Sequence, residues 1–304
     1  MPEATVVIPL FDKGPWIARA IASVLRQSAR DFAVIVVDDA SRDDGPERVA
    51  AFTDARIRLI RLTHAGASAA RNAGIRSAQS PFIAFLDADD EWEPDHLETL
   101  LRLHKRRLEA GVCATAVRFI RRQDGAPQDP TYFGFPEAPW EGIIPDYFQS
   151  AAMGKPPVCS SAAGIPAKVL EETGLFPEGV DLGEDLDLWG RIAISFPTAF
   201  SHSGRALYHK DAGNRTCLRI PRERELPFIE TARARLRAGT VPEHLVHSLR
   251  AYCCKLLYLT CRTMIRAGRP QRATRLLADS GFMNDDNGHI RRIRIALRGR
   301  GCAP

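Results

Sequence analysis

Short apolar runs alternate with segments of helical spacing along the first 120 residues. The runs are rich in β-branched and aromatic residues, and each is followed within two residues by a polar one, which predicts strands at 5–10, 32–37, 57–62, 82–86 and 112–120. Between them, apolar side chains recur every three or four residues, which predicts helices at 16–25, 47–52, 67–78 and 93–109. This alternation predicts an α/β fold with a mostly parallel sheet covered by helices on both faces.

The remainder of the chain changes character twice. Residues 121–164 are rich in proline and glycine with scattered aromatic residues, which indicates either a lid or excursion over a site or an irregular surface. Helical segments are predicted at 166–172 and 184–195, and from about residue 221 the pattern is entirely helical, at 222–238, 242–267, 270–279 and 290–297. We therefore expect a domain over 1–220 and a helical region over 221–304.

The segment after the predicted strand at 82–86 is the most informative one for chemistry. A buried apolar run ends there in Asp87, Asp89 and Asp90. Burying unpaired charges is costly, so these acids belong at the strand's carboxyl end, where open α/β sheets place ligand crevices. Crowded carboxylates repel one another unless a cation lies among them, and hard divalent ions prefer oxygen ligands. An acidic surface turn is the alternative.

Other polar clusters also follow apolar segments, and together they weaken that alternative. They lie at 11–13, at 38–39 and at 183–185. At one edge of a single sheet, these clusters and the acids at 87–90 would outline a crevice lined with carboxylates.

The composition is that of a globular protein, with 45% apolar and 26% charged residues among 304. No apolar run approaches the ~20 residues that span a bilayer, and no signal peptide opens the chain, so we expect a cytoplasmic protein. The seven cysteines are odd in number and lack paired CxxC spacing, which favours free thiols over a disulfide framework or a zinc site.

The formal charge of +5 is concentrated at the C-terminal end. Residues 262–304 hold ten arginines and three acids, a net charge of +7, which leaves −2 for the rest of the chain. The basic amphipathic segment at 290–298 suggests peripheral contact with an anionic membrane near lipid-linked acceptors, with a solvated helix face or a disordered end as the alternative. Basic charge without stacking aromatics is poor evidence for nucleic acid, so no such partner is expected.

A series of motifs in this order resembles family 2 glycosyltransferases over roughly residues 4–210. The motifs are VVIPLFDK at 6–13, ASVLRQS at 22–28, IVVDDASRD at 35–43, GASAARNAG at 66–74, FLDADD at 85–90, GLF at 174–176 and GEDLDLW at 183–189. The resemblance implies a GT-A fold and inverting transfer of a sugar from a nucleoside diphosphate donor, most simply a UDP-sugar, to a hydroxyl of a saccharide or lipid-linked acceptor. Synthesis of a cell-surface polysaccharide or glycoconjugate would be the setting. Residues 1–120 would bind the nucleotide sugar, and 121–220 would bind the acceptor and complete the catalytic site.

The same resemblance implies roles for residues that bind the donor. Phe11 and Asp39 should hold the base and ribose, together with Pro9 of the same first motif. An aromatic face stacks on a pyrimidine, and a carboxylate accepts a base N–H. Arg71 would pair with the diphosphate because a guanidinium forks onto phosphate oxygens, with a salt bridge to a nearby acid as the alternative.

The acids at the end of the fourth predicted strand would hold the metal. By resemblance Asp89 is the direct ligand of Mg²⁺ or Mn²⁺, and Asp87 lies nearer the ribose and also serves the metal. Such an ion stabilises the charge that builds on the leaving diphosphate. His209 is a tentative further ligand, and Lys210 or Arg215 a candidate diphosphate contact, in a stretch that departs from the family's common pattern.

Asp185 matches the family's general base. A positioned carboxylate that takes the acceptor's proton contributes roughly 10²- to 10⁴-fold to the rate. Glu184 is the second candidate for this role, and one of the carboxylates that include Asp187 could instead stabilise the helix N-terminus. Trp189 lies one turn after Asp185, where it would shape the acceptor pocket or, as the simpler alternative, fill the core.

Two other functions share this architecture. A sugar-nucleotide nucleotidyltransferase usually carries a glycine-rich basic loop after the first strand, whereas Pro9, Leu10, Phe11 and Asp12 stand here. A catalytically inactive binding or scaffold protein would not need to keep all the acids named above. Both alternatives are therefore less favoured than the transferase.

Overall fold

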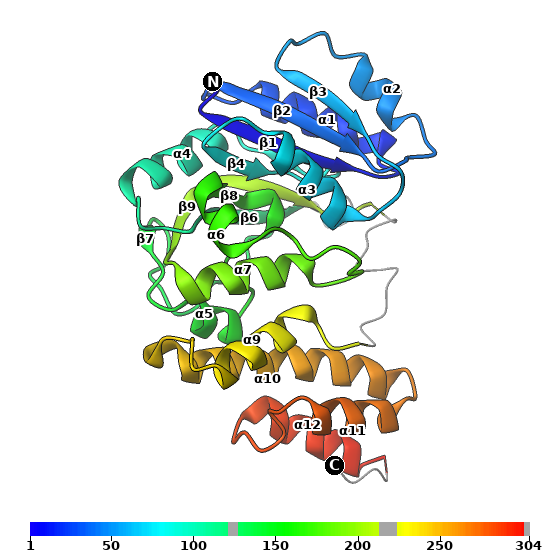
Figure 1. Ribbon diagram of the computed structural model, residues 1–304, viewed down its shortest axis with the longest axis vertical. Helices are drawn as coiled ribbons and strands as arrows, with labels where there is room; N and C mark the ends of the chain where they lie inside the picture. The colour runs from blue at the N-terminus through cyan, green and yellow to red at the C-terminus, as the bar shows by residue number, and fades with distance from the viewer. Residues whose placement is uncertain (121–126, 213–223, 301–304) are drawn as a thin grey trace.

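The computed structural model describes residues 1–120, 127–212 and 224–300. A nine-stranded sheet runs through the upper part of the molecule, with helices on both faces (Figure 1). Four neighbouring strands are parallel, in the order β3-β2-β1-β4. They are β1 (Ala4–Leu10), β2 (Phe32–Asp38), β3 (Ile57–Arg61) and β4 (Phe82–Phe85). The predicted α/β class and the parallel half of the sheet are thus confirmed.

The other half of the sheet is mixed. It continues from β4 through β8 (Ala163–Pro166), β6 (Val112–Ile120), β9 (Thr198–His209) and β5 (Glu91–Trp92), and β7 (Glu141–Ile143) also pairs with β9. Strand β8 is antiparallel to both β4 and β6, while β6 and β9 are parallel. Of these strands, the sequence predicts only β6.

Side chains of β1, β2 and β4 are buried on both faces, which explains their continuous apolar runs, whereas β3 lies at the edge of the sheet and exposes Arg58 and Arg61. Val6 and Ile8 of β1 point into the core beneath one layer of helices, and Val7 points into the opposite core. The first layer consists of α1 (Gly14–Leu25), α2 (Gly45–Ala50) and α4 (His96–Arg106); the second includes α3 (Ala67–Ser77), α6 (Ala167–Thr173) and α7 (Glu184–Ser195) (Figure 1).

The stretch expected as a lid or an irregular surface contains regular structure in its described part. It includes β7, α5 (Tyr147–Met153) and a short 3₁₀ helix at Ser160–Ala162. Tyr132 and Phe135 pack against Phe200 of β9, with ring centroids 5.0 Å away in both cases. These aromatic side chains therefore cover β9 between its partners β6 and β7.

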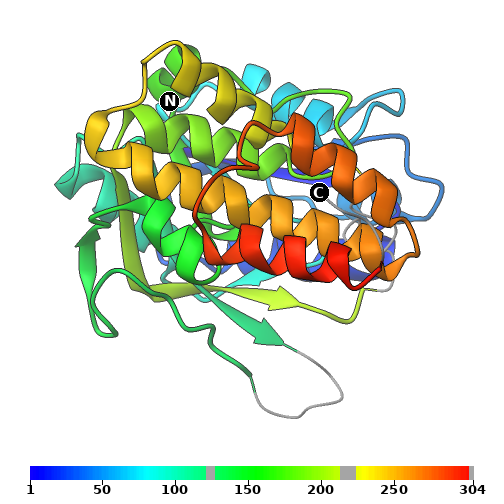
Figure 2. The same cartoon turned by 90° about the horizontal axis from the view of Figure 1, so that it is seen from below.

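Among residues 224–300, four helices form the lower part of the molecule: α9 (Pro227–Arg237), α10 (Glu243–Arg266), α11 (Pro270–Asp279) and α12 (Gly288–Arg298). Helix α10 crosses beneath the α/β part, and α11 and α12 lie beside it (Figures 1 and 2). Phe148 of α5 stacks on Phe228 of α9 at 5.8 Å, so the helices share an apolar core with the α/β part. The boundary expected at residue 220 falls outside the described residues.

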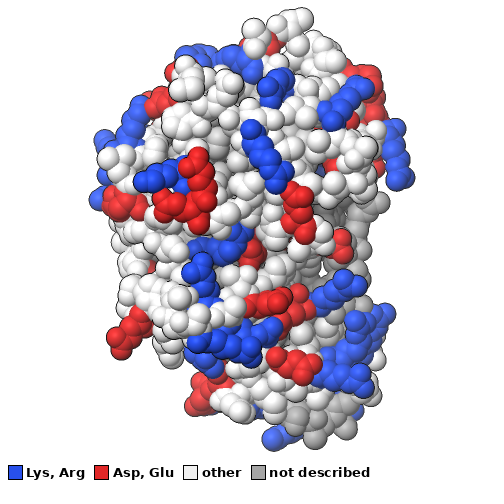
Figure 3. Space-filling model, viewed as in Figure 1, with Lys and Arg blue, Asp and Glu red and all other residues white. Residues whose placement is uncertain are grey.

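The basic C-terminal segment packs differently from a membrane-surface helix. Ile290, Ile293 and Leu297 of α12 are buried against the rest of the protein, and Ile295 is 69% exposed. Most of the apolar face predicted to meet a membrane is therefore inside the fold. Several basic side chains lie on the surface of the lower part of the molecule (Figure 3). No described helix is both long and apolar enough to span a bilayer.

The cysteines within the described ranges are free thiols, as expected: Cys113, Cys159, Cys253, Cys254 and Cys261. Cys217 and Cys302 lie outside those ranges.

Candidate active site

The polar clusters of the sequence meet at the carboxyl ends of the parallel strands. Leu10 at the end of β1 is in register with Asp38 at the end of β2, and β4 pairs with the other side of β1. The loops that follow these strands therefore lie side by side, as open α/β sheets arrange their ligand crevices.

Arg71 on α3 joins two parts of this crevice. Its side chain donates to Asp87 Oδ1 at 2.8 Å and to Glu184 Oε1 at 3.1 Å, so it links the loop after β4 to the start of α7. Burial opposes the charge on Arg71, yet the two carboxylates raise its pKa above the ordinary value. The expected alternative, a salt bridge to a nearby acid, is present.

The position of Arg71 depends on close packing of its helix against the sheet. Gly74 on α3 faces β1, and a Cβ at this position would lie 2.3 Å from Val7 Cγ1. Arg71 is only 5% exposed. Its Nε–H is buried and has no hydrogen-bond partner among the residues that the structure describes.

The acids in the loop after β4 have different surroundings. Asp89 Oδ2 lies 2.6 Å from Lys13 Nζ, and the Asp89 carbonyl accepts a hydrogen bond from Arg19. Asp90 is 1% exposed and is held by other groups. Its two oxygens accept from the backbone N–H of His209 at 2.9 Å and from Ser161 Oγ at 2.5 Å. Burial and the neighbouring carboxylates raise the pKa of Asp90 well above its usual range.

His209, the tentative metal ligand, lies beside this loop at the end of β9. Its Nε2 is 2.9 Å from Glu91 Oε1, and this hydrogen bond lowers the pKa of the Glu91 carboxyl. One ring nitrogen of His209 is thus engaged by a carboxylate. Within residues 1–120, 127–212 and 224–300, no group of three or more His, Cys, Asp or Glu side chains is arranged to hold a metal.

The acidic loop nevertheless carries oxygen ligands that suit a metal ion whose coordination is completed by the phosphates of a substrate. Mg²⁺ is commonly bound through one or two carboxylates, with waters and substrate phosphates completing its coordination. Asp87 and Asp89, which are separated by one residue, supply two carboxylates just after the end of β4. Their present partners, Arg71 and Lys13, are cations, which indicates that this position favours positive charge.

The expected base-binding end lies around Asp39. Asp39 is 2% exposed, and its two oxygens accept from the backbone N–H groups of Ala65 at 2.7 Å and Gly66 at 2.8 Å. It therefore fixes the loop that leads into α3. His64 Nδ1 lies 2.9 Å from Asp39 Oδ2, and the His64 ring stacks on Phe11 at 4.5 Å.

His64 is a residue of this site that the sequence analysis does not single out. Its only sequence signal is its position just before the GASAA motif. Pro9 lies in β1, paired with Val37 and two residues before Phe11.

Two other histidines have structural contacts elsewhere in the fold. His96 begins α4 and is fully buried, with Nδ1 2.5 Å from the Gly204 carbonyl. Burial lowers the pKa of His96 to about 3. His202 contacts the Pro136 carbonyl at 3.0 Å. Neither of these two takes part in the crevice contacts described above.

The start of α7 carries the candidate base. Asp185 Oδ1 accepts from the Leu186 N–H at 2.8 Å. Burial and the charge of Glu184 raise the pKa of Asp185 to about 7, although Arg71 acts in the opposite direction. A carboxyl with this pKa is partly ionised at neutral pH and retains a strong affinity for a proton, as a general base requires.

The other residues considered on α7 are structural. Asp187 accepts from Thr231 Oγ1 at 2.7 Å and from Arg191 Nε at 2.8 Å, so it connects α7 to α9. Trp189 is fully buried between Phe85 and Phe176, as the simpler interpretation expected. Within GEDLDLW, the acids near the crevice are therefore Glu184 and Asp185.

The sequence model of glycosyl transferase family 2 matches residues 5–174. This match covers more than half of the chain, which therefore belongs to glycosyltransferase family 2. An uncharacterized glycosyltransferase of Rickettsia felis is 31% identical over 192 residues, which cover 63% of this chain and 30% of that protein. The succinoglycan biosynthesis protein ExoO of Rhizobium meliloti is 43% identical over 102 residues, covering 33% of this chain and 29% of that protein. The chain thus spans about 30% of the length of these relatives.

Solved structures of low sequence identity share the fold. The TarS 1-349 fragment of S. aureus, in complex with UDP-GlcNAc, superposes with a TM-score of 0.73 at 16% identity, covering 98% of this chain and 87% of that one. The mannosyltransferase PcManGT of Pyrobaculum calidifontis, in complex with GDP-Man and Mn²⁺, gives a TM-score of 0.61 at 19% identity, with coverage of 98% and 86%. The GT-A-like fold is thereby confirmed.

Proposed function

We propose that this chain transfers a sugar, with inversion, from a UDP-sugar to an acceptor hydroxyl during synthesis of a polysaccharide or another glycoconjugate. Membership of family 2 and relatives such as ExoO support the reaction class and setting. The observation that carries the proposal is the bridge from Arg71 to Asp87 and Glu184. It brings the acidic loop and the helix of the candidate base to one crevice.

In this proposal Phe11, Pro9 and Asp39 line the base and ribose end, with His64 as an added contact. Asp39 Oδ1 accepts one backbone N–H and, as a carboxylate oxygen, has a second lone pair for a ligand donor, whereas Oδ2 already meets both the Gly66 N–H and His64 Nδ1. The Phe11–His64 stack offers aromatic surface to a pyrimidine ring.

The diphosphate would lie between Arg71 and the acidic loop. Arg71 has a buried Nε–H without a partner among the described residues, and a phosphate oxygen would satisfy this donor. Asp87 and Asp89 would hold Mg²⁺ or Mn²⁺, which when bound stabilises negative charge on a leaving diphosphate. His209 remains a tentative further ligand because its Nε2 already meets Glu91.

Asp185 would take the proton of the acceptor hydroxyl while the oxygen bonds to the anomeric carbon. Direct displacement from the face opposite the diphosphate inverts the configuration. Glu184 supports this role by raising the pKa of Asp185, and its own ion pair with Arg71 makes it the weaker candidate for the base.

The alternative functions are less well supported. A nucleotidyltransferase would need a triphosphate-binding loop after β1, where this chain carries Pro9, Leu10, Phe11 and Asp12. An inactive scaffold protein would not need Asp185 at a pKa near neutrality. A turnover assay distinguishes both from the transferase.

For cellular setting, we propose action at a cytoplasmic membrane face through electrostatic contact. The exposed arginines of α10, α11 and α12 support this contact: Arg262, Arg266, Arg272, Arg275, Arg291, Arg292 and Arg298. Because most of the apolar face of α12 is buried, attraction to anionic lipid would dominate over insertion.

The test is turnover of a panel of UDP- and GDP-sugars, each with and without Mn²⁺. We expect release of UDP from at least one donor, stimulated by the metal. Thermal shifts with UDP and GDP report binding independently, because a ligand of the folded state raises the melting temperature. Neither binding nor turnover with any donor would contradict the proposal.

A further inference from the structure

The short 3₁₀ helix at Ser160–Ala162 lies beside the acidic loop because of the register of two strands. It comes directly before β8, and β8 runs antiparallel to β4 with Phe85 opposite Ala163. Continuing this register by two residues past the end of β4 brings Asp87 opposite Ser161. A residue of the expected acceptor-binding half of the domain is thus placed against the first acid of the loop.

The Ser161 side chain continues the pairing where the two strands end. Its Oγ accepts a hydrogen bond from the Asp87 N–H at 3.2 Å and donates one to Asp90 Oδ2 at 2.5 Å. The turn between these two acids is closed by the Asp90 N–H, which donates to the Asp87 carbonyl at 3.0 Å. One hydroxyl therefore holds both ends of the turn 87–90, which contains the expected metal ligands.

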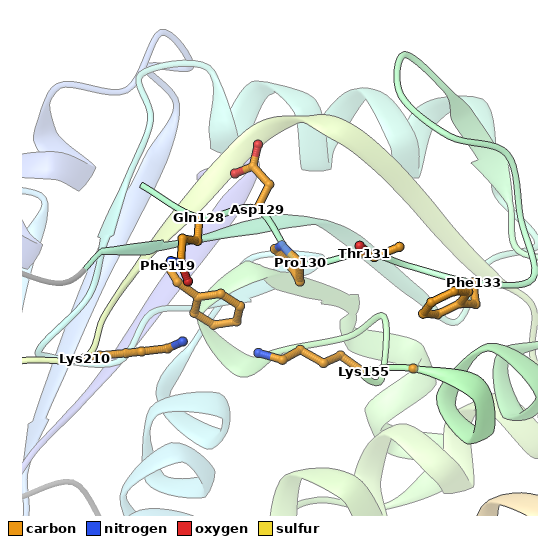
Figure 4. Close-up of a pocket in the computed structure, with 9 residues that line it drawn as sticks. Phe119, Gln128, Asp129, Pro130, Thr131, Phe133, Lys155 and Lys210 are labelled. Atoms are coloured by element: carbon orange, nitrogen blue, oxygen red, sulfur yellow. The ribbon is translucent and has the colours of Figure 1, made fainter. Parts of the chain in front are cut away.

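Ser161 is itself fixed by its surroundings. It is fully buried, and its carbonyl accepts a hydrogen bond at 2.6 Å from Nε1 of Trp92, which follows the loop in the chain. The other partner of the Asp90 carboxylate is the N–H of His209, at the end of β9. The next residue there, Lys210, lines a pocket of about 470 Å³ (Figure 4). Ser161 thus holds the loop from the packed core, whereas His209 holds it from the border of a pocket.

The hydroxyl of Ser161 leaves the side chains of the expected metal ligands to other partners. It meets Asp87 through the backbone, and the carboxylates of Asp87 and Asp89 pair with Arg71 and Lys13. A group that fixes the backbone of a metal-binding loop in this way orients the ligands without being one. Removing such an outer-shell partner typically weakens metal binding by about 10- to 100-fold.

We propose that Ser161 is a positioning residue for the divalent metal ion. Its hydroxyl fixes the turn 87–90 so that Asp87 and Asp89 together can hold the ion, and it acts through these two acids. This inference rests on the proposed transferase function and adds a residue from the second half of the domain to the metal site.

The test measures the Mn²⁺ affinity of the full chain at a saturating concentration of UDP, by electron paramagnetic resonance of free Mn²⁺. Ser161→Ala removes the hydroxyl without adding volume, and we expect it to weaken Mn²⁺ binding by about 10- to 100-fold. The affinity for UDP without metal, measured by calorimetry, should stay near wild type, because the expected base and ribose contacts at Phe11 and Asp39 are unchanged. A general structural defect would lower both affinities.

Ser160→Ala is the matched control. Ser160 precedes Ser161 in the same 3₁₀ helix and is 4% exposed, but its Oγ is buried without a hydrogen-bond partner among the residues that the structure describes. Its removal should change the Mn²⁺ affinity little. Ser161→Cys carries the test if Ser161→Ala does not fold. The thiol fills the space of the hydroxyl but is a weak donor and acceptor, so the Mn²⁺ affinity should again fall.

The outcomes separate this inference from the proposed function. Wild-type Mn²⁺ affinity in Ser161→Ala, or an equal loss in Ser160→Ala, overturns the positioning role while binding of UDP and Mn²⁺ by the wild type stands. Equal losses of Mn²⁺ affinity and metal-free UDP affinity, or failure of both Ser161 variants to fold, would assign the residue to stability alone and also overturn it. Absence of UDP or Mn²⁺ binding to the wild type is instead a failure of the proposed function.

Discussion

The two acidic groups that meet at Arg71 differ in how their charges are balanced. After β4, Asp87 pairs with Arg71 and Asp89 pairs with Lys13. At the start of α7, Glu184 pairs with Arg71, whereas among the described residues Asp185 accepts a hydrogen bond only from the Leu186 N–H. The carboxylates of Asp87 and Asp89 after β4 are thus each paired with a cation, whereas the negative charge of Asp185 at the start of α7 is poorly compensated.

In each group, one further acid has a structural role. Asp90 is buried and accepts hydrogen bonds from Ser161 and the backbone N–H of His209. Asp187 is buried and accepts hydrogen bonds from Thr231 and Arg191. An acid within a motif therefore need not serve the reaction. The comparison teaches that charge environment, more than sequence position, separates a cation-holding carboxylate from a base and from a structural anchor.

The largest effect is expected from Asp185→Asn. The variant keeps the size of the side chain but cannot accept the acceptor's proton, so kcat should fall by about 10²- to 10⁴-fold. Thermal unfolding and UDP affinity should stay near wild type. Glu184→Gln serves as the comparison, and a larger loss in that variant would exchange the roles of the two acids.

A smaller but distinct effect is expected on stability. Asp187→Ala leaves Arg191 and Thr231 without their buried partner, which should cost about 3 kcal/mol in the free energy of unfolding. Asp181→Ala, at an exposed site before α7, is the control and should change little. Urea denaturation measures both. If the two variants were equally stable, Asp187 would not have the structural role assigned to it.

The smallest effect is a shift in pH dependence. Asp185 must be ionised to act as a base, so kcat should rise with pH around a midpoint of about 7. Burial is the main cause of this raised pKa, and the charge of Glu184 is the second. Glu184→Gln removes the second cause, lowers the pKa of Asp185 and moves the acid limb to lower pH. A limb that stays in place or moves upward would contradict this electrostatic account.

How far the sequence predicts the fold depends on burial. Strands β1, β2, β4 and β6 are largely buried on both faces and appear as apolar runs, so the sequence predicts them. Strand β3 is also predicted, although two exposed arginines interrupt its apolar residues. Strand β9 reads TAFSHSGRALYH, with polar residues and a glycine inside it, and gives no such run. Strands β5 and β7 are only two and three residues long, too short for any periodic signal.

The sequence predicts the site residues that lie within motifs, but it does not predict the contacts between side chains that are far apart in the chain. The acids of the DADD and GED motifs were singled out from sequence, and the structure joins the two motifs through Arg71. Lys13 and Asp89 are 76 residues apart, and no local pattern announces their ion pair. The contact of His64 with Asp39 and the burial of Asp90 depend in the same way on tertiary packing.

The most direct test of the account is calorimetric titration of UDP with Mn²⁺ into the wild type, Asp89→Asn and Asp185→Asn. The account predicts that Asp185→Asn binds like the wild type and that Asp89→Asn binds about tenfold more weakly or not at all. If Asp89→Asn retained wild-type affinity for UDP and Mn²⁺, the loop after β4 would not hold the metal and the diphosphate, and the account would be contradicted.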